Sequence, residues 1–291
     1  MSFAPVRKVL AGGREHWQHG PIDLVIEARG EAAALARAHA NAWARFQDVL
    51  AELVFELPLL RLPAEEAGAV RGPVARRMME AALRYVPRFI TPMAAVAGSV
   101  AEEVLGFFAA EPGVTRAFVN NGGDIALHLG AGQSFTIGLV ADAYAPAVNG
   151  HVRMEADSGI RGIATSGWRG RSFSLGIADS VTVLARSAAA ADAAATMIAN
   201  AVDVDHPSIT RAPADSLKDD TDLGCRLVTV NVGTLPGSLR AAALDAGVHA
   251  AGEFLRRGLI IGAALALQDE WRSVGELQAT LPANARQRLA A

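Results

Sequence analysis

The stretch Ala178–Thr196 (ADSVTVLARSAAAADAAAT) decides the fold class, because it joins a β-strand directly to an α-helix. Its first part, Ala178–Ala185, is rich in valine and threonine, which suit the pleated, half-buried surface of a strand. Alanine, the residue most favourable to helix, dominates the second part, and a helix is predicted over Ser187–Val202.

Similar signals extend to both sides of this stretch. Strands are predicted over Ile22–Ala28, Val114–Asn120, the residues up to Leu129, Phe135–Val140, Leu227–Val232 and Leu259–Leu267. Helices are predicted over Glu31–Val54, Val74–Tyr85, Thr91–Ala109 and Leu239–Arg257, with Gly258 as the cap that ends the last one. Connections are expected at Leu57–Leu62, Gly159–Gly170 and Asp203–Asp222.

The order helix, short loop, strand recurs at Met93–Leu129 and Leu239–Leu267, which suggests an internal duplication. No linker divides the chain, so we expect one domain over residues 1–291. The predicted architecture is an α+β fold of two related, intimately packed halves. A helix or a loose tail is expected over about residues 272–291.

Composition excludes several classes of protein. Hydrophobic residues make up 51% of the chain and charged residues 20%, which argues against disorder. The net charge of −3 and the lack of a basic stripe argue against a nucleic-acid partner. The single cysteine, Cys225, fits a reducing compartment. No signal peptide and no apolar run of membrane-spanning length is found, so a cytoplasmic protein without a membrane partner is expected.

Three segments carry residues suited to chemistry. The first, Asn121-Gly122-Gly123-Asp124, presents an amide and a carboxylate beside glycines that can adopt positive φ or approach a ligand closely. A tight hairpin turn explains the same four residues equally well. The sequence alone leaves these two interpretations open.

The second segment is Thr165-Ser166-Gly167, followed by Arg169 and Arg171. Hydroxyls, exposed backbone amides and arginines in a glycine-rich loop can hold a phosphate. The spacing is not that of a GxxxxGK[ST] phosphate loop, and an ordinary polar loop is the competing interpretation.

The third segment holds Asp192 and Thr196, whose spacing of four residues puts both side-chain oxygens on one face of the predicted helix. These are hard ligands suited to Mg²⁺, although two are too few to hold the ion without help from a substrate. A favourable interaction of Asp192 with the helix dipole is the alternative. Because an unpaired aspartate on an alanine-rich face would be costly to bury, we expect Asp192 to have a partner.

Other catalytic patterns are missing. The histidines show no HxxxH spacing and there is no CxxC, which argues against zinc, and neither a GxSxG elbow nor a GxGxxG strand–helix turn is found. Small residues at the start of the helix predicted from Thr91 would let another backbone or a ligand come close: Ala94, Ala95, Ala97 and Gly98.

Taken in order, these segments resemble the FAD:protein FMN transferase (ApbE-like) superfamily. The family's pattern is a strand ending in a GGD loop, a TSG loop, and an SVTV strand that feeds a helix with ADxxxT. The corresponding segments here are Val119–Ile125, Ala164–Gly167, Ser180–Val183 and Ala191–Thr196. Further sequence segments, such as PMAAVAG at 92–98, are similar to an uncharacterised (UPF) branch of that superfamily.

The resemblance implies an α/β fold with a cleft for a flavin nucleotide. By it, Asp192 and Thr196 would bind Mg²⁺, and FAD would supply FMN to a threonine or serine of an acceptor protein. Roles in binding the cofactor would fall on the residues of the first two segments and on Asp179, namely Asn121, Gly122, Gly123, Asp124, Thr165, Ser166 and Gly167.

Two departures from the family pattern leave alternatives open. Ala97 stands where the transferases place a lysine, and the short segment Arg169–Asp179 lacks the family's HxxDPxTG letters. No catalytic residue is therefore assigned. A non-catalytic binding or accessory protein, or an enzyme of another reaction in the same cleft, remains an alternative to FMN transfer. The alanine-rich helices could pack internally or between subunits, so a homo-oligomer also stays open.

Overall fold

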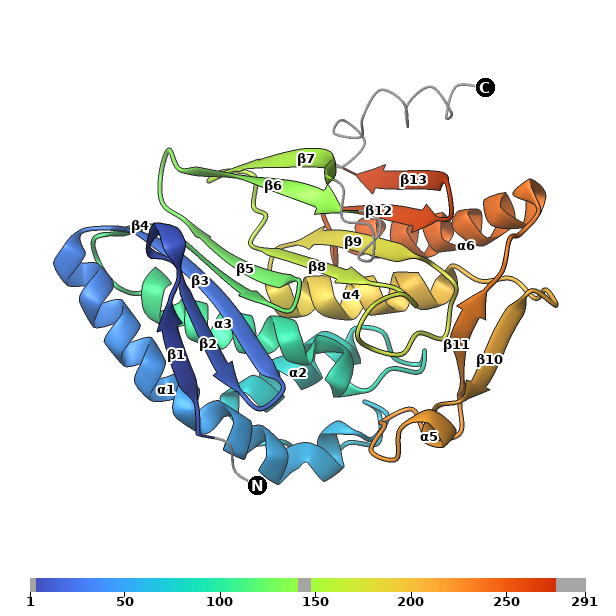
Figure 1. Cartoon of the computed structure of the whole chain (residues 1–291), viewed down its shortest axis with the longest axis horizontal. Helices are drawn as coiled ribbons and strands as arrows, with labels where there is room; N and C mark the ends of the chain where they lie inside the picture. Colours follow the sequence, from blue (N-terminus) through green and yellow to red (C-terminus); the bar gives the residue numbers. More distant parts are fainter. Residues whose placement is uncertain (1–3, 141–147, 276–291) are drawn as a thin grey trace. The chain divides into compact units, whose positions relative to one another are not determined.

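The computed structural model describes residues 4–140 and 148–275, and the chain divides into two compact units. Unit 1 comprises the residues up to Ser134 together with Glu155–Ala164 and Ala185–Ala193. Unit 2 comprises Phe135–Met154, Thr165–Leu184 and the residues from Ala194 onward. Helices and antiparallel sheets are both present in the chain, which confirms the predicted α+β class (Figure 1).

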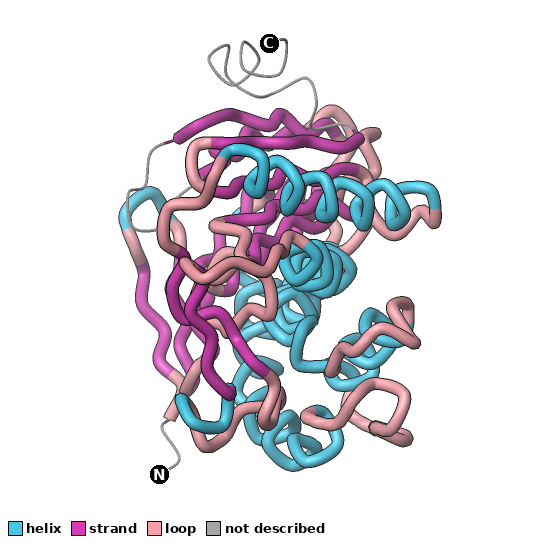
Figure 2. Tube along the Cα trace, turned by 90° about the vertical axis from the view of Figure 1, so that its right-hand side faces the viewer, coloured by secondary structure: helices cyan, strands magenta, loops and turns pink. Residues whose placement is uncertain are grey.

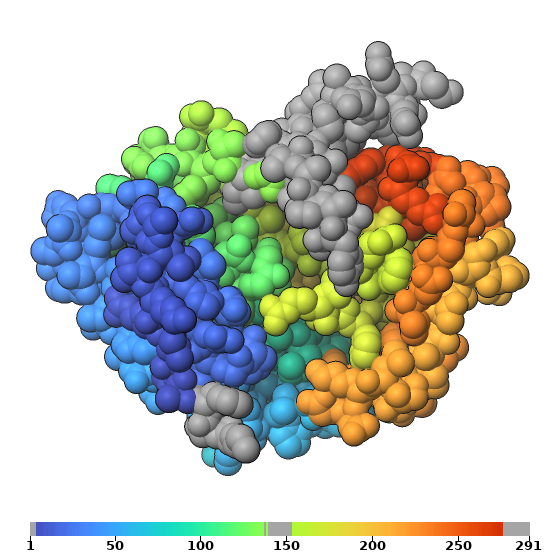
Figure 3. Space-filling model, in the orientation of Figure 1, coloured from blue at the N-terminus to red at the C-terminus, as the bar shows by residue number. Residues whose placement is uncertain are grey.

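Unit 1 contains an antiparallel sheet with the strand order β1-β2-β3-β4-β5-β8. Alternation in β3 places Ile22, Leu24 and Ile26 on the buried face. Strand β1 has an exposed side chain at every position and lies on the face turned to the viewer in Figure 3. The strands are β1 (Val6–Val9), β2 (Glu15–His19), β3 (Ile22–Gly30), β4 (Val114–Asn121), β5 (Asp124–Leu129) and β8 (Gly162–Ser166), whose last two residues belong to unit 2.

Helices cover one face of this sheet (Figure 2). The core between them is apolar and aromatic, with the rings of Trp17 and Trp43 5.2 Å apart in an edge-to-face arrangement. The helical elements of unit 1 are η1 (Ala11–Gly13), α1 (Ala32–Leu60), α2 (Pro73–Leu83), η2 (Pro92–Ala95), α3 (Val96–Ala109) and the first residues of α4 (Ala188–Ala201). Within the described part of the chain, Pro92–Ala109 is the one stretch long and apolar enough to span a membrane, and half of it is buried in the protein.

Unit 2 contains three strands in the order β9-β12-β13, all antiparallel. Every residue of β9 and β12 is buried. The elements of unit 2 are β6 (Ser134–Val140), β7 (Val148–Glu155), β9 (Ser180–Ala185), β10 (Ile209–Pro213), α5 (Ala214–Leu217), β11 (Leu227–Val232), α6 (Gly237–Arg256), β12 (Gly262–Leu267), β13 (Glu270–Gly275) and most of α4. The predicted tail from residue 272 begins inside β13, and residues 276–291 lie outside the described residues.

The connection predicted at Leu57–Leu62 is wrong, because α1 continues through Pro58 to Leu60. Pro58 lies on the exposed side of the helix, where a carbonyl that loses its usual amide partner can turn to water. The extra turn carries Glu56, whose carboxylate accepts the backbone N–H groups of Arg71 and Gly72 at 2.5 and 2.9 Å. This contact ties the end of α1 to the start of α2.

Two further predicted connections contain regular structure. Residues within Gly159–Gly170 form β8, because Ile163 and Ala164 are buried and Ile163 pairs with Ile125 of β5. The segment Asp203–Asp222 contains β10 and α5, since β10 finds its partner in β11. Both corrections depend on pairing with a strand outside the segment itself, which the residue types within the segment do not predict. The Gly258 cap is confirmed, because its N–H and that of Leu259 bond back to carbonyls of α6.

A polar cluster around the buried Glu15 joins β1, β2 and α1 within unit 1. Glu15 accepts two hydrogen bonds from Arg7, at 2.6 and 2.7 Å, and one from the indole of Trp17 at 2.7 Å. Nδ1 of His39 lies 3.4 Å from Oε1 of Glu15 but makes no hydrogen bond to a described residue. Burial lowers the pKa of His39, with Glu15 opposing and Arg7 adding to the shift. Burial opposes ionisation of Glu15, but the bonds from Arg7 and Trp17 bring its pKa below the usual value.

We therefore expect stability to fall as the pH drops. The folded chain binds a proton at His39 less readily than the unfolded chain. The contribution of neutral His39 to the free energy of unfolding is therefore fully present above about pH 6.5 and declines below it. Glu15 adds a loss at lower pH, below its ordinary pKa of 4.5. Urea unfolding between pH 8 and pH 5.5 measures the slope, which should flatten in His39→Gln and not in His249→Gln, where the histidine is exposed. An unchanged slope in His39→Gln would show that His39 is not the group responsible.

Candidate functional site

The first candidate segment forms the turn between β4 and β5. Asn121 pairs with Asp124 across the strands, so Gly122 and Gly123 are the two loop residues. Their φ angles of 65° and 116° are the positive values that a two-residue hairpin requires. Oδ1 of Asn120 accepts the N–H of Gly123 at 2.8 Å and stabilises the turn. The hairpin interpretation is thus observed, and it places Asn121 and Asp124 side by side at the strand ends.

Asn121 ties this turn to the start of α3. It is buried, its Nδ2 donates to the carbonyl of Ala97 at 3.1 Å, and its Oδ1 accepts the N–H of Asp23 at 3.3 Å. Both ends of the amide are therefore used within unit 1. The side chain fixes the end of β4 relative to the first turn of the helix.

The start of α3 is capped from another helix. Ala95, the residue that precedes α3, has no side chain that could cap the helix. Instead Oδ2 of Asp192 on α4 accepts the N–H of Gly98 at 2.9 Å, and its carboxylate also takes the N–H of Ala97. The partner that the sequence predicts for Asp192 is thus the positive end of α3, where a carboxylate is favoured.

Gly98 is what allows this contact. A Cβ at this position would lie 2.3 Å from the carbonyl oxygen of Ala188 and 2.9 Å from the nitrogen of Ala189, both backbone atoms. The prediction that small residues at the start of this helix admit another backbone is confirmed here. Because α4 begins at Ala188, Asp192 is the fifth residue of the helix. The second turn of α4 therefore faces the N–H groups at the start of α3.

Asp192 is a strongly perturbed carboxyl group. Burial raises its pKa well above the usual value, and the carboxylate of Asp124 raises it further, while the N–H groups of Gly98 and Ala97 act in the opposite direction. Two acidic groups that interact in this way create a local negative electrostatic potential in unit 1. A divalent cation would relieve their repulsion, and carboxylate oxygens are the ligands that Mg²⁺ prefers.

The described residues fit such an ion only in part. Nowhere in residues 4–140 and 148–275 do three or more His, Cys, Asp or Glu side chains form a group that could hold a metal. Asp192 and Asp124 would thus supply two ligands, and phosphate or water oxygens would complete the shell, as is usual for Mg²⁺ in nucleotide sites. Thr196, the other predicted ligand, lies one turn further along α4, in unit 2.

The remaining candidates lie in unit 2. Thr165 and Ser166 end strand β8, and the Oγ1 atoms of Thr165 and Thr182 are 2.9 Å apart. Asp179 accepts bonds from Nε1 of Trp168 at 3.1 Å and from Nε of Arg169 at 2.7 Å, and a third from the backbone of Gln268. Asp179 therefore orders the loop that follows Gly167. The structure gives it this role, and its predicted contact with a cofactor stays a prediction.

Comparison with known proteins identifies the family. A family model described as "AbpE bacteria" matches residues 7–276. The chain belongs to this family. The ApbE-like kinship predicted from the ordered motifs is confirmed.

Relatives of this AbpE-family chain include archaeal proteins. The UPF0280 protein MK0206 of Methanopyrus kandleri is 40% identical over 148 residues, which cover 50% of this chain and 56% of the relative. The UPF0280 protein of Methanothrix thermoacetophila is 36% identical over 155 residues, covering 52% and 61%. The chain thus matches little more than half the length of these relatives.

Two solved structures align along nearly the whole AbpE-family chain. The apo form of the Pseudomonas stutzeri flavinyl transferase ApbE is 14% identical, with 94% of each chain covered and a TM-score of 0.40. The ApbE protein of Thermotoga maritima gives the same identity and TM-score, with 95% of this chain and 97% of that protein covered.

Proposed function

We propose that this chain binds a flavin nucleotide together with Mg²⁺ at the start of α3. The observation that carries the proposal is the buried carboxylate of Asp192, which accepts the N–H of Gly98 at 2.9 Å. Asp124 interacts electrostatically with it and pairs with Asn121, whose Nδ2 donates to the carbonyl of Ala97 in the same turn of α3. Both carboxylates belong to segments that match the family's GGD and ADxxxT motifs. Mg²⁺ would neutralise charge on a bound pyrophosphate.

The reaction proposed for the bound nucleotide is FMN transfer from FAD to a protein. A threonine or serine hydroxyl of the acceptor would attack the phosphorus of the FMN half, the pyrophosphate bond would break, and AMP would leave while the hydroxyl loses its proton. In this chain Asp192 and Asp124 would hold the cation, and Thr196 is the further ligand suggested by family resemblance. The amides of α3 would orient Asp192.

Binding without transfer is the second candidate, and Ala97 favours it. The backbone of Ala97 is engaged at both ends, by Asp192 and by Asn121, while its methyl group offers no cation where transferases carry lysine. A chain that lost this charge but kept the carboxylates would bind the nucleotide without cleaving it. Release of AMP from FAD in the presence of an acceptor distinguishes the two candidates.

Thermal unfolding with a panel of ligands tests the binding proposal. We expect FAD with Mg²⁺ to raise the Tm by several degrees, because a ligand at one hundred times its Kd adds about 2.7 kcal/mol of stability. FAD with EDTA should raise it much less. FMN and ADP, each with Mg²⁺, report which half of FAD is recognised. No shift with any of these ligands would contradict the proposal.

A further inference from the structure

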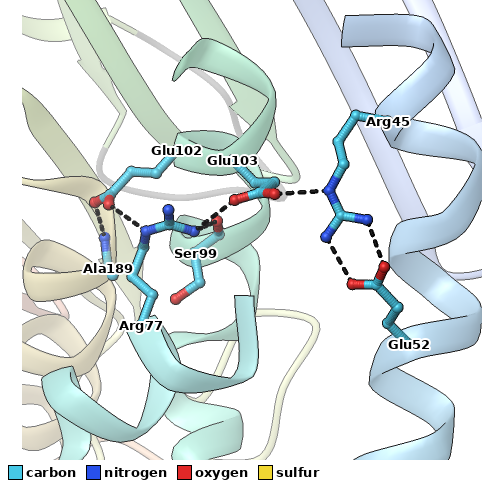
Figure 4. A network of polar contacts seen from close by, with 7 residues as sticks. All are labelled: Arg45, Glu52, Arg77, Ser99, Glu102, Glu103 and Ala189. Atoms are coloured by element: carbon cyan, nitrogen blue, oxygen red, sulfur yellow. Dashed lines mark hydrogen bonds and ion pairs between the residues drawn. The ribbon is translucent and has the colours of Figure 1, made fainter. Parts of the chain in front are cut away.

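Within unit 1, α3 and α4 cap each other's first turns. The N–H of Gly98 on α3 donates to Asp192 of α4. In the other direction, the N–H of Ala189 on α4 donates to Oε1 of Glu102 on α3 at 2.7 Å (Figure 4). Each helix start carries amide groups that its own residues leave unsatisfied. A carboxylate from the other helix satisfies them and interacts favourably with the helix dipole.

Glu102 is itself held in place by Arg77 of α2. Nε of Arg77 lies 3.1 Å from Oε2 of Glu102, and its Nη1 contacts Glu103 and the carbonyl of Ser99, each at 3.2 Å (Figure 4). One oxygen of Glu102 thus faces Arg77 and the other faces α4. Because both partners are cationic or backbone donors, the carboxylate is fixed between them.

The same network continues to α1 through a part that does not touch α4. Arg45 donates to Glu103 at 2.7 Å and makes a two-pronged contact with Glu52 at 2.7 and 2.6 Å (Figure 4). Glu52 is therefore a matched carboxylate for experiments. It belongs to the network but is separated from α4 by two arginines.

The position of Asp192 depends on how the first turn of α4 is held. Ala188 packs directly on Gly98, as the short distance from a hypothetical Cβ shows. Asp192 follows Ala189 by three residues on the same helix, so a shift at Ala189 moves the carboxylate relative to the amides of α3. The bond from Ala189 to Glu102 is the polar contact that fixes this turn to α3.

We propose that Glu102 and Arg77 are positioning residues for Asp192, which sets its carboxylate on the amides of Ala97 and Gly98. The metal-binding part of this proposal rests on the proposed function, whereas the positioning itself does not. Partners behind a metal ligand usually change metal affinity by about 10–100-fold when they are removed. Glu102 and Arg77 would act one step further away, through the first turn of α4, without touching Asp192 or the ion.

Amide exchange at Gly98 tests the positioning without any ligand. In the full chain labelled with ¹⁵N-glycine, Glu102→Gln should speed exchange at Gly98 by about tenfold, because a loosened first turn of α4 weakens the charge-assisted bond from Gly98 to Asp192. Gly106, on the same helix, is the internal reference, and its exchange should change much less. Glu52→Gln should leave the ratio of the two rates unchanged. An unchanged ratio in Glu102→Gln would overturn the proposal.

Arg77 provides a second pair of variants if Glu102→Gln does not fold. Arg77→Gln should raise the ratio of Gly98 to Gly106 exchange. Arg77→Lys should bring the ratio part of the way back to the wild-type value, since lysine keeps a charge for Glu102 but lacks the fork that also contacts Glu103 and Ser99. An unchanged ratio in Arg77→Gln would overturn the role of Arg77. Mg²⁺ titration of the same proteins should show affinity about tenfold weaker in Glu102→Gln than in wild type. If wild type binds no Mg²⁺, the proposed function fails while the exchange result still decides the positioning.

Discussion

Replacing Gly98 by alanine should destabilise unit 1 by about 3 kcal/mol. The added methyl group would lie 2.3 Å from the carbonyl oxygen of Ala188 and 2.5 Å from its carbon, and backbone atoms cannot move aside as a flexible side chain can. Relief requires α4 to withdraw from α3, which also lengthens the bond from Gly98 to Asp192. The measurement is the free energy of unfolding in urea, together with Mg²⁺ affinity, and both should fall.

Gly106→Ala is the matched control for this change. Gly106 lies on the same helix and is exposed, and a Cβ added there would have no heavy atom within 4 Å. Because alanine favours helix over glycine by about 1 kcal/mol, this variant should be slightly more stable than wild type. Equal effects of the two substitutions would mean that the contact between Gly98 and Ala188 is not as tight as described.

Replacing Asp192 by asparagine should separate metal binding from stability. Asparagine keeps one oxygen for the N–H groups of Gly98 and Ala97, and loss of the charge that repels Asp124 offsets the weaker acceptor. The free energy of unfolding should therefore stay within about 1 kcal/mol of wild type. Affinity for Mg²⁺ in the presence of FAD should fall by about 100-fold or more, since a direct ligand matters at least as much as its supporting residues. Urea unfolding and calorimetric Mg²⁺ titration measure the two effects.

A more disruptive variant and a control variant accompany Asp192→Asn. Asp192→Ala removes the acceptor as well as the charge, and leaving the N–H groups of Gly98 and Ala97 unsatisfied should cost at least about 2 kcal/mol. Asp48→Asn changes an exposed carboxylate on α1 and should alter neither quantity. Mg²⁺ affinity of the wild-type level in Asp192→Asn would remove Asp192 from the metal site.

Much of the secondary structure follows from the residue types within each segment. The strand and helix around Asp192 were predictable because the valine–threonine run and the alanine run each favour one structure strongly, and Gly258 marks the end of α6 as expected. Local preference was misleading at Pro58, at β8 and at β10, where buried side chains or a distant partner strand overrule it. The proposed internal duplication is not tested by these elements.

Candidate site residues could be chosen from the sequence, whereas the contacts that they make could not. The spacing of Asp192 and Thr196 suggested a metal, but nothing local reports that Asp192 caps a helix some 94 residues earlier in the chain. Gly98 stands out in the sequence as a small residue, whereas Glu102 and Arg77 do not stand out, because charges on helices usually face solvent. Their signal appears only when α2, α3 and α4 are brought together in space.

The most direct test of flavin binding is a calorimetric titration of the full chain with FAD, with and without Mg²⁺. We predict tight binding that depends on Mg²⁺, because the carboxylates of Asp192 and Asp124 would repel the pyrophosphate unless a cation lies between them. Binding of equal strength with Mg²⁺ and with EDTA, or no binding in either condition, would contradict the proposed site.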